Sequence, residues 1–126
     1  MREIKFRGYN RKREMWLNGS YILNRGHHFI APDEFAEGKT WEDYEVEEDS
    51  IGQFTGVCDC DHEPIYEGDL LISLTLGMTF QFEVVYEAPR FCVKNEDVGT
   101  FFINDTRQWK AVGNVHDGID VEGGEV

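Results

Sequence analysis

The sequence contains few of the residues that break up or cross-link a chain. It has three prolines and three cysteines in 126 residues, of which 13% are aromatic. This composition favours an ordered globular protein over a disordered one. The odd cysteine count and the absence of an apolar segment near the start lead us to expect no secretory signal and free thiols in a reducing cytoplasm. The longest aliphatic run, Leu70–Ile72, is far too short to span a bilayer, so we expect no membrane anchor.

Basic residues are also scarce. There are 12 of them against 25 acidic residues, which gives a formal net charge of −13. Half of the basic residues lie in the first 13 positions, whereas positions 33–49 contain nine acids and one lysine, Lys39. A negative field of this kind repels nucleic acid at long range and favours solubility or a basic partner. Any nucleic-acid contact would therefore have to use the N-terminal segment.

The length fits a single domain, with enough chain to bury a core without metal or disulfide cross-links. The order of apolar and acidic residues divides this domain into three parts. These are N-terminal strands with an acidic loop at 1–50, a barrel-forming half at 51–117, and an acidic tail at 118–126 that we expect to fray. Whether residues 1–50 fold as a separate subdomain is left open by the sequence.

The first part of the chain carries short β-type patterns. Residues 2–9 alternate between an apolar side and a charged side that includes Lys5 and Arg7, which predicts a half-buried strand. Asn18-Gly19 predicts a tight hairpin turn, and another short strand is expected around residues 28–30. The residues from Pro32 to Phe35 have the composition of a first helical turn, with proline at its start and acids following.

The longest alternating patterns lie on either side of Gly77-Met78, which we interpret as a turn. Before the turn, alternation places four aliphatic residues on one face; after it, four aromatic or aliphatic residues alternate in the same way. This pattern predicts an antiparallel hairpin whose apolar faces close over the interior. The residues concerned are Leu70, Ile72, Leu74 and Leu76, then Phe80, Phe82, Val84 and Tyr86.

Further short strands are expected at residues 91–93, 101–103 and 109–115. Many short strands with little helical periodicity are typical of a small barrel or sandwich. The predicted fold class is therefore mainly β: a small barrel of antiparallel strands, with an irregular acidic connection and at most short helical turns.

Four blocks of sequence stand out in order along the chain: MREIKFRGYN at the start, IGQFTG at Ile51–Gly56, IYEGDLL at Ile65–Leu71 and AVGNVHD at Ala111–Asp117. Together they resemble the YopX family, whose members are small proteins encoded mainly by bacteriophages and prophages. The resemblance implies an SH3-like barrel and a location in the cytoplasm of a bacterial host, and it carries over no catalytic residues. The turn before the third block departs from the family pattern, which is usually rich in Lys, Asn and Gly.

The third block begins with a run, Ile65-Tyr66-Glu67-Gly68-Asp69, that contains two closely spaced acids. Paired carboxylates act as general acid and base only when their environments separate their pKa values, and no base or nucleophile stands beside them in the sequence. We interpret the run as a structural turn that leads into a strand. Gly68 permits a positive φ there, and Asp69 accepts backbone N–H bonds.

Cys58, Cys60 and His62 superficially resemble a metal site. Structural zinc sites usually have two to four residues between paired cysteines, and a fourth ligand would require the distant Cys92 or an acid. We therefore expect an exposed turn with incidental thiols and no metal or cofactor, although metal binding is left open. A thiol enzyme would also need a nearby base, which sequence proximity to His62 does not supply.

The N-terminal basic residues have two interpretations. Basic side chains beside aromatic rings are what single-stranded nucleic-acid binders use. Alternatively, the same charges pair with the acidic residues at 33–49, which is the interpretation that the net charge favours. The candidate patch consists of Arg2, Lys5, Arg7, Arg11, Lys12, Arg13 and Trp16.

The function expected from these observations is that of a non-enzymatic phage or prophage accessory protein. It would act through contacts with a protein partner whose identity the sequence does not indicate, and homo-oligomers are expected from open strand edges. There are two alternatives: a nucleic-acid-binding barrel that uses the basic segment, and an acidic mimic of nucleic acid that binds a basic host protein.

Overall fold

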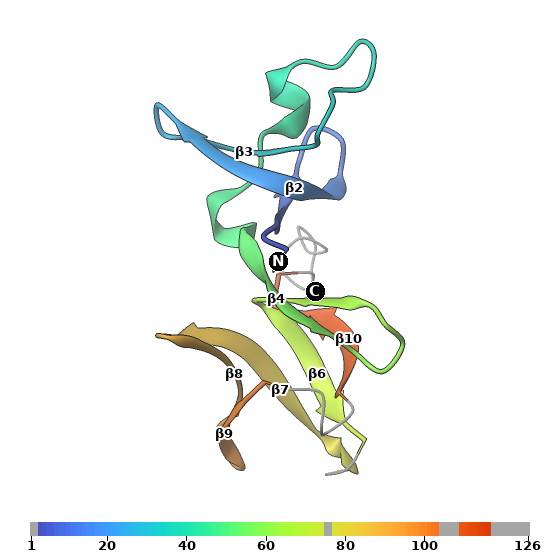
Figure 1. Ribbon diagram of the computed structural model, residues 1–126, viewed down its shortest axis with the longest axis vertical. Coiled ribbons are helices and arrows are strands. Elements are labelled where there is room, and N and C mark those ends of the chain that lie inside the picture. The colour runs from blue at the N-terminus through green and yellow to red at the C-terminus, as the bar shows by residue number, and fades with distance from the viewer. Residues whose placement is uncertain (1–2, 75–76, 104–108, 117–126) are drawn as a thin grey trace. The chain divides into compact units, whose positions relative to one another are not determined.

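The computed structural model describes residues 3–74, 77–103 and 109–116. Within it the chain divides into two compact units, Met1–Phe54 and Thr55–Val126, coloured blue to green and green to red in Figure 1. We call them the N-terminal and C-terminal units and describe each by itself. The boundary falls after Phe54, whereas the sequence pattern places its division after residue 50.

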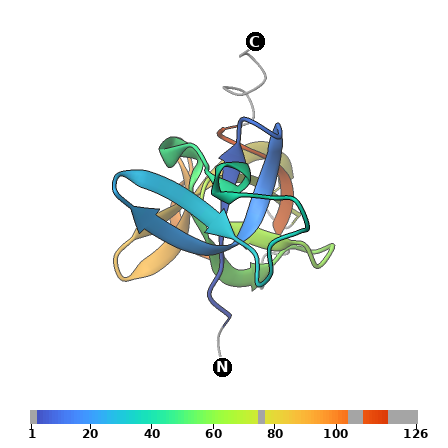
Figure 2. The ribbon, with the colours of Figure 1, turned by 90° about the horizontal axis from the view of Figure 1, so that it is seen from above.

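The N-terminal unit is a set of antiparallel strands followed by two single-turn 3-10 helices. β1 pairs with β2 on one side and with the first residues of β4 on the other, while β2 also pairs with β3. Figure 2 shows the long β2–β3 ribbon in blue. The elements are β1 (Phe6–Asn10), β2 (Met15–Asn24), β3 (His27–Ala31), η1 (Trp41–Tyr44), η2 (Glu48–Ser50) and β4 (Gly52–Cys58).

The turn predicted at Asn18-Gly19 is wrong. β2 runs through both residues, and at this point it changes partner: Gly19 pairs with β1, and the next residue pairs with Ala31 of β3. Gly19 has a φ of 158°, and a β-carbon there would overlap the backbone carbonyl oxygen of Ala31. Glycine is thus needed for a close approach of two backbones rather than for a turn. The hairpin turn lies instead at Arg25-Gly26, where both φ values are positive, at 54° and 82°.

Two further expectations for this unit need correction. No helical turn begins at Pro32; the first begins at Trp41, where Thr40 and Asp43 form a capping box. The outward charged face predicted for the first strand does not include Arg7, which is only 9% exposed. Its guanidinium carbon lies 5.0 Å from the centre of the Trp16 ring, so the stacked cation replaces an apolar residue at this position.

The C-terminal unit contains a five-stranded antiparallel sheet in the order β10-β6-β7-β8-β9. The mainly β, antiparallel prediction is confirmed, and in the described residues both sheets of the protein are open rather than closed into a barrel. The predicted frayed tail at 118–126 lies outside the described residues. The strands of this unit, besides the end of β4, are β5 (Pro64–Tyr66), β6 (Asp69–Ser73), β7 (Gly77–Glu87), β8 (Arg90–Asn95), β9 (Gly99–Phe102) and β10 (Trp109–Asn114).

The predicted hairpin exists as β6 and β7, with two corrections. Gly77 and Met78 belong to β7 and not to a turn, and Leu76 of the predicted pattern lies outside the described residues. The inner face of β6 is also shifted by one residue, because Leu71 lies opposite Phe82 and both are fully buried. Ile72, on the other face of the strand, is 6% exposed, whereas Leu74 is 43% exposed. β6 is covered on both faces, and a strand of that kind gives an aliphatic run instead of a clear alternation.

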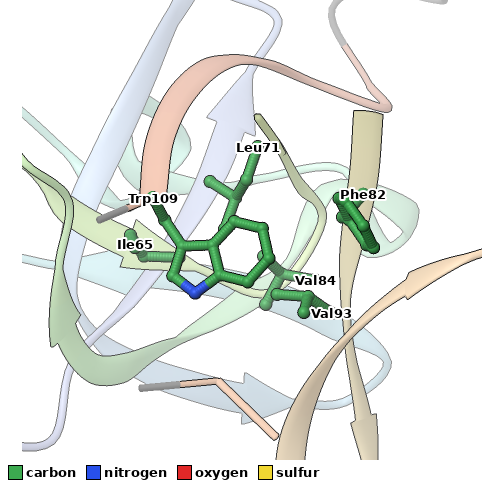
Figure 3. Packing of buried hydrophobic residues seen from close by; sticks show 6 residues of the cluster. All are labelled: Ile65, Leu71, Phe82, Val84, Val93 and Trp109. Carbon is green, nitrogen blue, oxygen red and sulfur yellow. The ribbon is translucent and has the colours of Figure 1, made fainter. Parts of the chain in front are cut away.

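Each unit has its own apolar core. In the C-terminal unit six buried side chains pack together, with the Trp109 indole among the aliphatic side chains and its ring 5.2 Å from Phe82 (Figure 3). In the N-terminal unit the core is smaller and contains Leu17, Ile30, Tyr44 and Val46. Tyr44 and Val46 come from residues 33–49, which we call the acidic connection. This segment is therefore part of the fold of its unit and not a loose arm.

Candidate functional site

The acidic connection folds back onto the turn between β1 and β2. This turn contains Arg11, Lys12 and Arg13, and we call it the basic turn. Arg11 contacts the Glu47 carboxylate at 3.4 Å, and Lys12 contacts Asp43 at 3.1 Å. Arg13 donates to the Asp43 carbonyl oxygen at 3.2 Å. These contacts are those expected if the acidic residues neutralise the basic patch. Exposed pairs of this type each add at most about 1 kcal/mol to stability, but together they lower the positive potential of the turn.

The other members of the predicted patch are dispersed or used within the protein. Lys5 lies 3.8 Å from Glu3 and 4.9 Å above the Phe54 ring. Trp16 lies against Arg7, and its ring is 5.5 Å from that of Tyr9. Arg2 lies outside the described residues. The described members therefore do not present an aromatic platform surrounded by unpaired cations.

A residue that the sequence analysis did not single out holds this arrangement together. Asn10, 1% exposed, donates from its side-chain amide to the carbonyl oxygens of Glu42 and Glu45 at 3.3 and 2.7 Å. Its side-chain oxygen accepts the Arg13 N–H at 2.6 Å. Nothing local in the sequence distinguishes Asn10 from an ordinary turn asparagine, because two of its partners lie more than 30 residues away.

Asp43 is the best-defined charge of the acidic connection. Its carboxylate accepts the Thr40 N–H at 2.9 Å and binds the Lys12 ammonium. The backbone bond from Thr40 and then the contact with Lys12 hold the pKa of Asp43 below its ordinary value, although burial acts in the opposite direction. The carboxylate therefore stays charged and serves as an anchor.

Two histidines of β3 hold the same connection from the other side. His27 Nδ1 lies 2.8 Å from Glu45 Oε2, and His28 Nε2 lies 3.7 Å from Glu48 Oε1. The other ring nitrogen of His28 shares a hydrogen bond of 2.6 Å with the Tyr21 hydroxyl. The two imidazoles lie on opposite faces of the strand, as expected for neighbouring strand residues, so they do not form one site.

Four aromatic rings gather where the connection crosses β3. Trp41 lies 5.2 Å from Phe29 and 4.8 Å from Phe35, whose ring is 4.4 Å from Tyr44. Tyr44 is buried, but Trp41 is 49% exposed and Phe35 is 38% exposed. We call the exposed pair Phe35 and Trp41 the aromatic surface. The sequence alone predicts no such surface, because the contact between the two rings is made only in the folded chain.

The turn from Cys58 to Glu63 is organised by Asp59. Its carboxylate accepts the N–H groups of Asp61, Glu63 and Ala111 at 2.8, 2.9 and 3.0 Å. These three bonds outweigh burial, which acts to raise the pKa of Asp59, and hold it below its ordinary value. The Cys60 N–H also bonds the Trp109 carbonyl oxygen, so this turn covers the outer edge of β10.

Two sequence features that superficially resemble functional sites are the Cys58–His62 turn and the paired acids Glu67 and Asp69. Cys58 and Cys60 are exposed, and within the described part of the chain no cluster of three or more His, Cys, Asp or Glu is arranged to hold a metal. Gly68 has a φ of 93°, and Asp69 accepts the Tyr66 N–H at 2.8 Å. This is the geometry that the structural-turn interpretation of residues 65–69 requires.

Comparisons with known proteins agree with this architecture. The model of the family described as YopX protein matches residues 5–118. The crystal structure of protein EF1440 from Enterococcus faecalis is similar with a TM-score of 0.59 at 17% identity, covering 96% of this chain and 99% of that one. At this identity the similarity shows a shared fold alone. No curated protein matches the sequence. Among the described residues, no helix is both long and apolar enough to cross a bilayer.

Proposed function

The chain belongs to the YopX family, and from that premise we propose that it is a non-enzymatic accessory protein of a bacteriophage or prophage that acts by binding another protein in the host cytoplasm. We also propose that residues 51–117 have the SH3-like arrangement that the family resemblance implies. The five-stranded antiparallel sheet of this region and its single buried core support it.

One observation carries the proposal: the acidic connection neutralises the basic turn. Lys12 and Arg11 bind carboxylates of their own unit, and Arg13 bonds a carbonyl oxygen there. Phosphate binding depends on basic groups whose counterions can be released, so cations already matched by carboxylates attract a nucleic acid weakly. The acids that do not contact this turn and the exposed aromatic residues remain available to a partner. These groups suit a protein better than a nucleic acid.

The acidic-mimic alternative receives less support. At least five of the nine acids at 33–49 contact a basic or histidine side chain of the same chain, so they are not free to imitate a row of phosphates. These five are Glu42, Asp43, Glu45, Glu47 and Glu48. Self-association is compatible with the proposal through β9, which ends its sheet and in the described residues pairs with β8 alone.

The test is affinity purification from an infected or lysogenic host, followed by native mass measurement of the recovered complex. We expect a stoichiometric protein partner that survives nuclease treatment. In parallel, oligonucleotide binding at low salt is measured for the wild-type chain and for a variant with Arg11, Lys12 and Arg13 changed to glutamine. Tight oligonucleotide binding that this variant loses would replace the proposal with the nucleic-acid alternative.

A further inference from the structure

The aromatic surface lies between two hollows in the N-terminal unit. One, of about 290 Å³, is lined by Ile22, Asn24, Phe29 and Trp41. The other, of about 390 Å³, has Phe35 in its wall, together with Glu34 and the buried Tyr44. Because the rings of Phe35 and Trp41 contact each other at 4.8 Å, this pair forms a ridge between the hollows. A half-exposed tryptophan beside an apolar hollow is the kind of feature that dominates binding energy in protein interfaces.

Acidic residues outnumber basic ones in the segment that forms the ridge, residues 33–41, which contains three acids and one lysine, Lys39. Asp33, Glu34 and Glu37 surround Phe35 in the sequence and are exposed. In the described residues none of these three carboxylates has an ion-pair partner, in contrast to the acids farther along the connection. A ligand with positive charge therefore gains from them without first breaking an existing pair.

The cation that lines the larger hollow is already engaged. Arg13 lines the larger hollow, but its guanidinium bonds the Asp43 carbonyl oxygen and lies 5.5 Å from the centre of the Tyr44 ring. The same ring stacking shows that this wall accepts a guanidinium group. An incoming cationic side chain would have Glu34 and the face of Phe35 available to it.

We propose that the aromatic surface binds a basic polypeptide segment of another protein, with an apolar side chain in the smaller hollow beside Trp41 and lysine or arginine side chains beside Asp33, Glu34 and Glu37. This inference rests on the proposed protein-binding function and adds the surface and the chemistry of the partner. A second copy of this chain fits poorly, because it carries the same charge of −13 and its own basic turn is matched by carboxylates. A nucleic acid is repelled by the same acids.

The test uses a bead-displayed library of random peptides, screened against the full chain at moderate salt. We expect the bound peptides to be enriched in lysine or arginine together with one large apolar side chain. The strongest peptide, resynthesised with a fluorescent label, should bind Trp41→Ala about tenfold more weakly than wild type, which is the size of effect seen when a central aromatic is removed. The double variant Glu34→Gln/Glu37→Gln should bind several-fold more weakly and with a smaller dependence on salt.

Matched controls separate the site from general charge attraction. Phe102→Ala removes an aromatic that is 58% exposed in the other unit, and Glu96→Gln/Asp97→Asn removes two exposed acids there; both should change binding by less than about twofold. Equal effects of Trp41→Ala and Phe102→Ala, or enrichment of charge with no apolar side chain, would overturn the inference. So would a native mass showing that Trp41 mediates self-association.

The host experiment distinguishes this inference from the proposed function. If Trp41→Ala still recovers the same stoichiometric partner as wild type, the protein-binding function stands and the aromatic surface is not its site. If the wild-type chain recovers no protein partner, the proposed function itself fails. Circular dichroism of each variant verifies that any loss of binding occurs in a folded chain.

Discussion

Asn10→Ala should loosen the acidic connection within the N-terminal unit. The substitution removes two donated hydrogen bonds, to the Glu42 and Glu45 carbonyl oxygens, and one accepted from the Arg13 N–H. A buried polar group left without its partner costs about 1–3 kcal/mol, but water can reach the half-buried carbonyls once the side chain is gone. We therefore expect a loss of about 3 kcal/mol, well below the sum of three full penalties.

The assay is urea unfolding followed by tryptophan fluorescence, combined with hydrogen exchange of residues 41–50. Asn10→Asp separates hydrogen bonding from volume, because the carboxylate still accepts the Arg13 N–H but cannot donate to the two carbonyl oxygens. It should destabilise the protein at least as much as alanine does at neutral pH. Asn18→Ala, an exposed strand asparagine, is the control and should change stability by less than about 0.5 kcal/mol. A loss below 1 kcal/mol for Asn10→Ala, with unchanged exchange protection, would refute the reasoning.

Three other predictions concern stability. Gly19→Ala should cost at least about 2 kcal/mol in chemical unfolding, because its β-carbon would overlap the Ala31 carbonyl oxygen. Asp59→Asn should destabilise the protein at neutral pH, and this difference should shrink in acid: the pKa of Asp59 is lowered in the folded state, so its contribution is present above the ordinary aspartate pKa and is lost as the pH falls through the folded value. Leu71→Ala should cost about 2–5 kcal/mol, and Leu70→Ala, at a partly exposed position on the other face of β6, clearly less.

Each of these has an outcome that contradicts it. Gly26→Ala is the control, because a β-carbon there meets open space and is opposed only by the positive φ of 82°. A loss for Gly19→Ala no larger than that of Gly26→Ala would mean that backbone approach at Gly19 is unimportant. A difference for Asp59→Asn that stays constant from neutral pH into acid would remove the argument from its pKa. Equal losses at Leu70 and Leu71 would show that the inner face of β6 is not the one described.

Local patterns predicted the C-terminal unit well. The alternation on either side of Gly77 identified the β6–β7 pair, and Gly68 with Asp69 was interpreted as the turn whose φ and hydrogen bond are observed. These features depend on residues close together in the chain, where side-chain period and backbone freedom decide the conformation. The inner face of β6 was predicted one residue out of place because both faces of this strand carry aliphatic side chains. The pattern therefore does not show which face points to the core.

In the N-terminal unit the same reasoning reached its limit at two residues. Asn18-Gly19 has the composition of a turn, yet Gly19 is required by the approach of a strand that lies 12 residues farther along. Asn10 resembles any turn asparagine, yet it anchors carbonyl groups of a segment far along the chain. In both cases the deciding partner is distant in sequence, and no local pattern reports it.

By itself, the sequence determined that this is a mainly β protein of the YopX family with an excess of acid, because strand period and composition are local or additive properties. Only the tertiary structure decided which charges meet. It matched the basic turn with the acidic connection and left Phe35 and Trp41 exposed. The acids next to Phe35 in the sequence have no ion-pair partner among the described residues. The physical reason is that electrostatic pairing and burial depend on distances through space, which the folded backbone sets and the order of residues alone does not.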